Sequence, residues 1–73
     1  MNEQELKDTL VRENGEFRKI LEEHRSCELE LDRIREKTHL TEADDVAERE
    51  IKKRKLALKD RMYRIMADFE NRS

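Results

Sequence analysis

The residues with the clearest chemical potential are His24 and Cys27, which lie three positions apart. On a helix this spacing places both side chains on one face, where they could act as two metal ligands. A structural zinc site needs four ligands, and only His39 and carboxylates remain to supply the other two. No catalytic partner motif accompanies the Cys27 thiol. Both positions also suit the seam between two helices, where a thiol and an imidazole ring fill space. We therefore predict packing at these positions, with no metal site.

A second candidate is the basic segment from Arg49 to Arg64, which holds eight basic residues and two acidic ones. Clustered positive charge is typical of phosphate-binding surfaces. Tyr63 is the one aromatic residue of the segment that could stack on a base. Residues 1–37 carry 11 acidic and 8 basic residues, so the positive charge could equally pair with an acidic helix alongside. Nucleic-acid binding through residues 49–64 is thus an alternative that we do not favour.

The composition argues against an enzyme. The chain has 73 residues, one Gly, no Pro and 4% aromatic residues, and it contains no glycine-rich phosphate loop. We expect no catalytic residue, no cofactor and no small-molecule substrate. No apolar run approaches the ~20 residues of a membrane helix, and the first residues lack the basic and apolar regions of a signal peptide. A single cysteine cannot form an internal disulfide. We expect a cytoplasmic protein that does not bind membranes.

The charge balance indicates helices and argues against disorder. Charged residues make up 49% of the chain, but 17 basic residues nearly cancel 19 acidic ones, whereas disordered chains combine few apolar residues with a large net charge. Asn14-Gly15 interrupts the helical periodicity with residues that tolerate the left-handed conformation of helix ends. Thr41 and Asp44 resemble a capping box. The sequence predicts one all-α domain with helices at about 3–13, 16–37 and 42–70 and a turn at 38–41.

Apolar residues form one stripe on each of the two long helices. On the middle helix the spacing alternates between 3 and 4, as in a coiled-coil seam, through Phe17, Ile20, His24, Cys27, Leu31, Ile34 and Thr38. The last helix carries a matching stripe through Ala43, Ala47, Ile51, Leu58, Met62, Ile65, Met66 and Phe69. If the chain reverses at the 38–41 turn, the two stripes meet and Phe17 lies opposite Ile65. We predict an antiparallel, coiled-coil-like helical hairpin.

Polar residues interrupt the two apolar stripes at positions that face each other in the antiparallel register. Arg54 and Lys55 lie opposite Cys27 and Glu28 in the antiparallel register. We predict a half-buried polar layer that fixes the register of the hairpin, in which Glu28 pairs with Lys55. Its members are His24, Cys27, Glu28, Arg54 and Lys55.

Several large apolar residues cannot be buried in an isolated hairpin. Leu56 and Tyr63 lie on another face of the last helix, and Leu6, Leu10 and Val11 form a patch on the first. Burying them requires a second copy, another protein, or the short helix folded over the hairpin. We expect a dimer of hairpins that forms a helical bundle, or binding to another protein. The candidate partner-binding residues are Lys52, Lys53, Leu56, Lys59 and Tyr63.

Residues 15–67 resemble the YdcH-like family of small bacterial proteins. The resemblance rests on Phe17-Arg-Lys-Ile-Leu-Glu-Glu-His24, on Met62-Tyr-Arg-Ile-Met66 and above all on Lys52-Lys-Arg-Lys-Leu-Ala-Leu-Lys-Asp60. Two positions depart from the family pattern, because Cys27 replaces a usual Leu and Asn14-Gly15 replaces an Asn-Pro-like break. The resemblance implies a short all-helical bacterial protein without an assigned activity. The positions that it carries over are His24, Lys52, Lys55, Leu56, Leu58, Lys59 and Asp60. From residues and resemblance together we expect a non-enzymatic protein-interaction or scaffold module.

Overall fold

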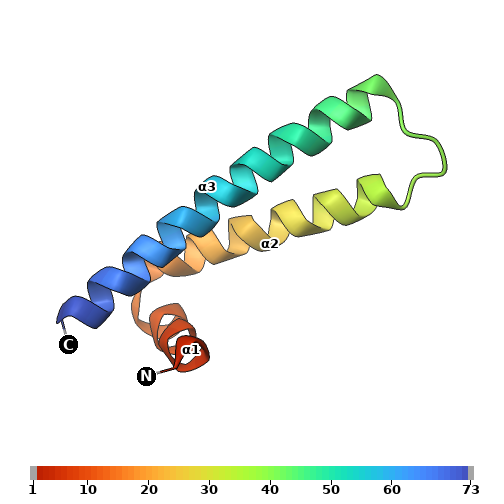
Figure 1. Ribbon diagram of the computed structural model, residues 1–73. Helices are drawn as coiled ribbons and strands as arrows, with labels where there is room; N and C mark the ends of the chain where they lie inside the picture. The colour runs from red at the N-terminus through yellow and green to blue at the C-terminus, as the bar shows by residue number, and fades with distance from the viewer. Residues whose placement is uncertain (1, 73) are drawn as a thin grey trace.

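The computed structural model describes residues 2–72, which form three helices (Figure 1). Helix α1 spans Glu3–Glu13, α2 spans Gly15–Arg35 and α3 spans Glu42–Arg72. Helices α2 and α3 run antiparallel as a long hairpin, and α1 folds back at the end away from the turn (Figure 1). The result is an elongated shape of 49 × 20 × 16 Å. The predicted all-helical hairpin with a short first helix is therefore confirmed, and no strand occurs among the described residues.

A reciprocal capping box starts α3. The Asp44 amide donates to Oγ1 of Thr41 at 3.1 Å, and the Thr41 amide donates to Oδ2 of Asp44 at 3.0 Å. Such a box satisfies two amide groups that have no partner within the helix. Lys37 adds an ion pair across the turn, with its Nζ 2.6 Å from Oδ1 of Asp44. The bond from Lys37 and those from Thr41 lower the pKa of Asp44 to about 2. These contacts close the predicted turn.

Asn14 produces the break between α1 and α2 by a different route from the one expected. Its backbone is extended, with φ −123° and ψ 105°, and no described residue has a positive φ. The Asn14 amide donates to the carbonyl of Leu10 at 2.8 Å, and its side-chain oxygen accepts from the amide of Phe17 at 2.9 Å. One residue thus ends α1 and caps α2. The left-handed helix end expected from Asn14-Gly15 is wrong, because Gly15 is already the first residue of α2.

Replacing Asn14 with alanine should lower the free energy of unfolding by about 1 kcal/mol, because the amide of Phe17 loses its cap. Urea unfolding followed by circular dichroism measures this change. Asn14→Asp should retain the stability of the original protein, since a carboxylate oxygen accepts the same bond. Equal loss in both variants would show that the cap is not the source of the effect.

The core lies where all three helices meet. Phe17, Ile20 and Cys27 of α2 pack with Leu58, Met62 and Met66 of α3, and Leu6 and Leu10 of α1 complete the same cluster. Ile65 and Phe69 pack against it, in agreement with the expected register of Phe17 and Ile65. Near the turn the predicted stripe of α3 is less buried, since Ala47 and Ile51 are half-buried and Ala43 is exposed. Of the three ways to bury the α1 patch, the structure uses the fold of α1 over the hairpin.

Candidate functional site

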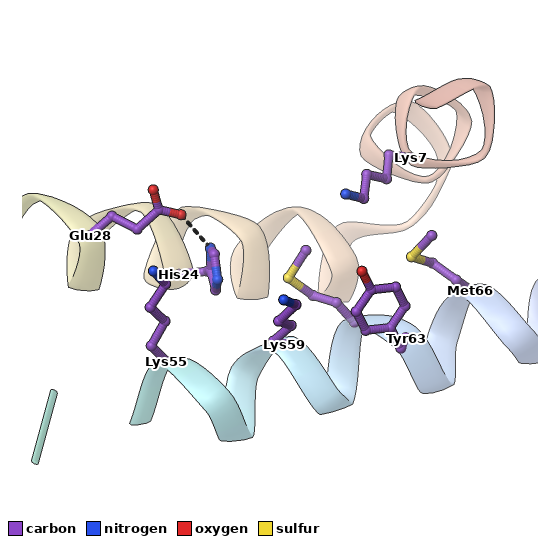
Figure 2. Close-up of a pocket in the computed structure, with 8 residues that line it drawn as sticks. Lys7, His24, Glu28, Lys55, Lys59, Tyr63 and Met66 are labelled. Carbon is purple, nitrogen blue, oxygen red and sulfur yellow. Dashed lines mark ion pairs between the residues drawn. The ribbon is translucent and has the colours of Figure 1, made fainter. Parts of the chain in front are cut away.

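Three adjoining hollows line one side of the hairpin. The middle hollow, of about 310 Å³, lies among Lys7, His24, Glu28, Lys55, Lys59, Met62, Tyr63 and Met66 (Figure 2). Toward the turn it shares Lys55 and Lys59 with a hollow of about 250 Å³ that also contacts Leu31, Arg35, Lys52 and Leu56. Toward α1 it shares Tyr63 and Met66 with a hollow of about 290 Å³ that also contacts Glu3, Leu6, Ala67 and Glu70. We refer to the three together as the α2/α3 groove.

The groove has an apolar floor and a rim that is mainly basic, with Glu3, Glu28 and Glu70 as its acidic members. Leu31, Met62 and Met66 are buried beneath it, and these side chains come from both helices of the hairpin. Lys55 and Lys59 point from α3 toward α2, and Lys7 points from α1 toward the same space (Figure 2). Lys55 and Lys59 are four residues apart, so they lie one above the other on one side of α3. The arrangement places three ammonium groups around an apolar surface.

His24 stands at the α2 wall of the middle hollow and is only 14% exposed in its side chain. Its Nδ1 lies 3.0 Å from Oε1 of Glu28, one turn along the same helix. Because a carboxylate only accepts hydrogen bonds, the neutral ring carries its proton on Nδ1. Nε2 is then an unprotonated acceptor, and this atom is buried without a hydrogen-bond partner in the described part of the chain.

The electrostatic surroundings keep His24 neutral at pH 7. Burial is the largest cause that lowers its pKa below the ordinary 6.5, and the charges of Lys55, Lys59 and Lys7 act in the same direction. The carboxylate of Glu28 opposes them. His24 therefore responds to the charge of the groove.

We expect Lys55→Gln/Lys59→Gln to raise the pKa of His24, since two of the cations that disfavour its protonation are removed. A titration of the His24 ring protons by NMR measures the shift. In the original protein, His24 becomes protonated at a higher pH in the unfolded chain than in the folded protein. Stability should therefore fall as the pH drops from about 6.5 to the lower folded pKa. A His24 pKa that ignores the double substitution would contradict the proximity of the two lysines.

The structure rearranges the predicted polar layer. Cys27 is buried in the core, and Lys55 is half-buried. Glu28 is exposed and pairs with His24 of its own helix in place of Lys55. Arg54 is exposed as well, because adjacent residues on a helix point about 100° apart and only one of Arg54 and Lys55 can face α2. At this level of the hairpin, the polar residues that lie together are His24 of α2 and Lys55 and Lys59 of α3.

The predicted partner-binding residues divide into two groups. Lys52, Leu56, Lys59 and Tyr63 line the groove, and the two apolar members are exposed, Leu56 by 61% and Tyr63 by 45%. Lys53 lies outside the hollows described above, on the solvent side of α3. Three members are engaged within the chain: Lys52 pairs with Glu48 at 2.8 Å, Lys53 pairs with Glu50 at 4.0 Å, and the Tyr63 hydroxyl donates to Oε1 of Glu3 at 3.2 Å. Leu56 and Lys59 are the members most available to a partner.

Sequence reasoning missed two contributors to this face. Lys7 reaches the groove from α1, and Arg35 reaches it from the end of α2. The antiparallel register that sets Phe17 opposite Ile65 puts Arg35 opposite Ala47, more than one helical turn from Lys52 and Leu56, so the register alone does not locate Arg35 in the groove. No signal in the sequence locates Lys7 there, because no local pattern fixes where the first helix lies against the hairpin.

The basic segment 49–64 does not form a single charged stripe. Residues 52 to 55 project in four directions, since each step along a helix turns by about 100°. Arg61 pairs with Glu16 of α2 at 3.3 Å, as expected if the positive charge is matched by the acidic helix. With regard to metals, Cys27 is enclosed in the core, and no group of three His, Cys, Asp or Glu side chains within residues 2–72 is arranged to hold an ion.

The protein is a small antiparallel hairpin of α2 and α3, with α1 docked at one end. It carries a groove that has an apolar floor and a mainly basic rim. Comparison with known families gives a match over residues 17–66 to the family described as protein of unknown function (DUF465). The chain belongs to this family, which confirms the predicted resemblance to the YdcH-like proteins. No curated protein and no solved structure matched the chain. Among the described residues, no helix is long and apolar enough to cross a membrane.

Proposed function

We propose that this protein is a non-enzymatic, cytoplasmic interaction module that binds another protein through the α2/α3 groove. The observation that supports it most is the exposure of Leu56 beside a groove with an apolar floor. Leu56 is 61% exposed, and Tyr63 follows one heptad later on the same side of α3. Exposed apolar side chains that are grouped along a groove with a polar rim are typical of protein-binding sites.

The burial of Leu6 and Leu10, where α1 packs against the hairpin, bears on whether the partner is a second copy of the chain. The expected dimer of hairpins was to bury this patch as well as Leu56 and Tyr63. Because α1 already covers its own apolar residues, the need for self-association is reduced to the face that carries Leu56. This observation favours another protein over a second hairpin as the groove's occupant.

Affinity capture from a bacterial lysate tests the proposal with a matched pair of variants. Leu56→Glu should lose most of the proteins retained by the original chain, because a carboxylate in the groove destroys the apolar contact. Leu29→Glu is the control, since Leu29 is 60% exposed on the opposite side of α2. Both variants should keep their helical circular dichroism. If Leu56→Glu captures the same proteins as the control, the groove is not the binding face.

Nucleic-acid binding remains the second candidate, and the basic segment 49–64 is the feature that supports it. Phosphate contacts make affinity fall steeply as salt increases. Retention on DNA or RNA that is lost at raised salt and in Lys52→Glu/Lys53→Glu would favour this candidate. A captured protein partner with no nucleic-acid binding at physiological salt would favour the interaction module. The spread of the basic residues around α3 supports the latter result.

A further inference from the structure

The geometry points to an acidic amphipathic helix of another protein as the occupant of the α2/α3 groove. This inference rests on the proposed function and adds the chemical class of the partner. Three features of the groove carry it: its length along α3, the apolar residues of its floor, and two lysines of its rim that form no ion pair with another of residues 2–72.

The groove is long and follows one helix. Each of the three hollows shares lining residues with the next one, and together they extend along α3 from Lys52 to Glu70. At a rise of about 1.5 Å per residue this stretch measures about 27 Å, the length of a helix of about 18 residues. An amphipathic helix that lies in a hydrophobic groove is a recurring mode of protein recognition. The shape thus favours a helical segment over a compact ligand.

The floor offers apolar contacts along most of that length. Leu31 and Leu56 line the hollow near the turn, and Met62, Tyr63 and Met66 line the other two. Methionine side chains are flexible and polarisable, so they adapt to differently shaped apolar residues. Apolar residues spaced by three and four along a partner helix would meet this floor on one face.

The rim determines the charge of the partner. Lys7 is held by Glu3 at 3.3 Å and Lys52 by Glu48 at 2.8 Å. The ion pairs formed by residues 2–72 leave Lys55 and Lys59 without a carboxylate partner. These two ammonium groups are one turn apart on α3 and repel each other. Carboxylates on a bound helix would relieve that repulsion.

The same charges argue against a second copy in the groove. If α3 of another hairpin occupied it, the lysines on this side of both chains would face each other. Like charges brought together at an interface suppress a partner. A helix with glutamate or aspartate along the edges of its apolar face has the complementary pattern.

Fluorescence titration with two synthetic helical peptides tests the inference. One is an 18-residue amphipathic peptide of Leu, Ala and Glu, and the other has Lys in place of each Glu. The acidic peptide should bind the full-length protein ~10-fold more tightly or better, because only its charges complement the rim. Its affinity should fall as salt increases. Equal binding of both peptides, or no binding of the acidic one at millimolar concentration, would overturn the inference.

Two double variants locate the site. Lys55→Glu/Lys59→Glu should weaken the acidic peptide by ~10-fold or more and reverse the preference between the peptides. Lys53→Glu/Arg64→Glu changes the net charge equally on the solvent side of α3 and should have less than a ~2-fold effect at physiological salt. An equal loss in both variants would overturn the site by showing that only net charge matters. In the original protein, peptide binding should raise the pKa of His24, since carboxylates then offset the lysines beside it.

Other occupants have distinct outcomes. Sedimentation that shows a dimer unable to bind the peptide would make a second copy the occupant, and displacement of the peptide by an oligonucleotide at physiological salt would make it nucleic acid. Either result overturns the inference. If the acidic peptide fails but Leu56→Glu still abolishes capture from the lysate, the partner class is wrong while the proposed function stands. If Leu56→Glu leaves capture unchanged, the proposed function fails.

Discussion

Phe17→Ala is expected to lower the free energy of unfolding by about 3–5 kcal/mol, the range for removing a fully buried aromatic side chain. Phe17 is 0% exposed and belongs to the cluster formed by all three helices. The core of a domain below ~80 residues rarely supplies more than ~3–5 kcal/mol of net stability. The variant should therefore be largely unfolded at 25 °C, with most of its helical circular dichroism lost.

Two further variants keep this prediction measurable. Phe17→Leu retains an apolar side chain and leaves a smaller cavity, so it should cost less than Phe17→Ala, a difference that urea unfolding can resolve. Leu56→Ala, at an exposed position, should change stability by no more than about 0.5 kcal/mol. If Phe17→Ala unfolds at the same urea concentration as the original protein, Phe17 does not lie at the centre of the core.

Leu10→Asp is expected to release α1 from the hairpin while α2 and α3 stay paired. Leu10 is 1% exposed, and an unpaired carboxylate at a buried site costs several kcal/mol. The chain can avoid this cost by undocking α1. A helix of 11 residues is marginal in water without tertiary contacts, so the segment should then unfold. Amide hydrogen exchange should show loss of protection over residues 3–13 and retained protection in α2 and α3.

A matched substitution on the exposed side of α1 serves as the control. Gln4→Glu also adds a carboxylate, and its repulsion with Asp8 one turn away should cost only about 0.2–0.5 kcal/mol. The α1 amides should remain protected in this variant. Continued protection of residues 3–13 in Leu10→Asp would contradict the buried position of Leu10. Exchange of all three helices together would show instead that α1 is required for the hairpin to fold.

The candidate site was predictable only in part. Leu56, Lys59 and Tyr63 could be found because residues three and four positions apart on a helix share one side. Lys53 is also among the predicted partner-binding residues, although its position on α3 turns it toward solvent. The partner of Glu28 could not be chosen from the register, since His24 of the same helix and Lys55 of the facing helix were both within reach. The choice depended on side-chain geometry, which brings Oε1 of Glu28 to His24.

The sequence by itself determined the elements of this fold and their direction. The apolar seams, the Thr41–Asp44 capping box and the near-neutral charge are local or periodic features, so they specify two long helices and the turn between them without knowledge of distant contacts. The tertiary structure alone decided where α1 lies. Leu6 and Leu10 would suit a bent continuation of the seam as well as a helix folded across it, and the extended backbone of Asn14 gives the second arrangement. That fold brings Lys7 to Lys55 and Lys59 and completes the groove, because contacts between residues far apart in the chain depend on packing that no local pattern specifies.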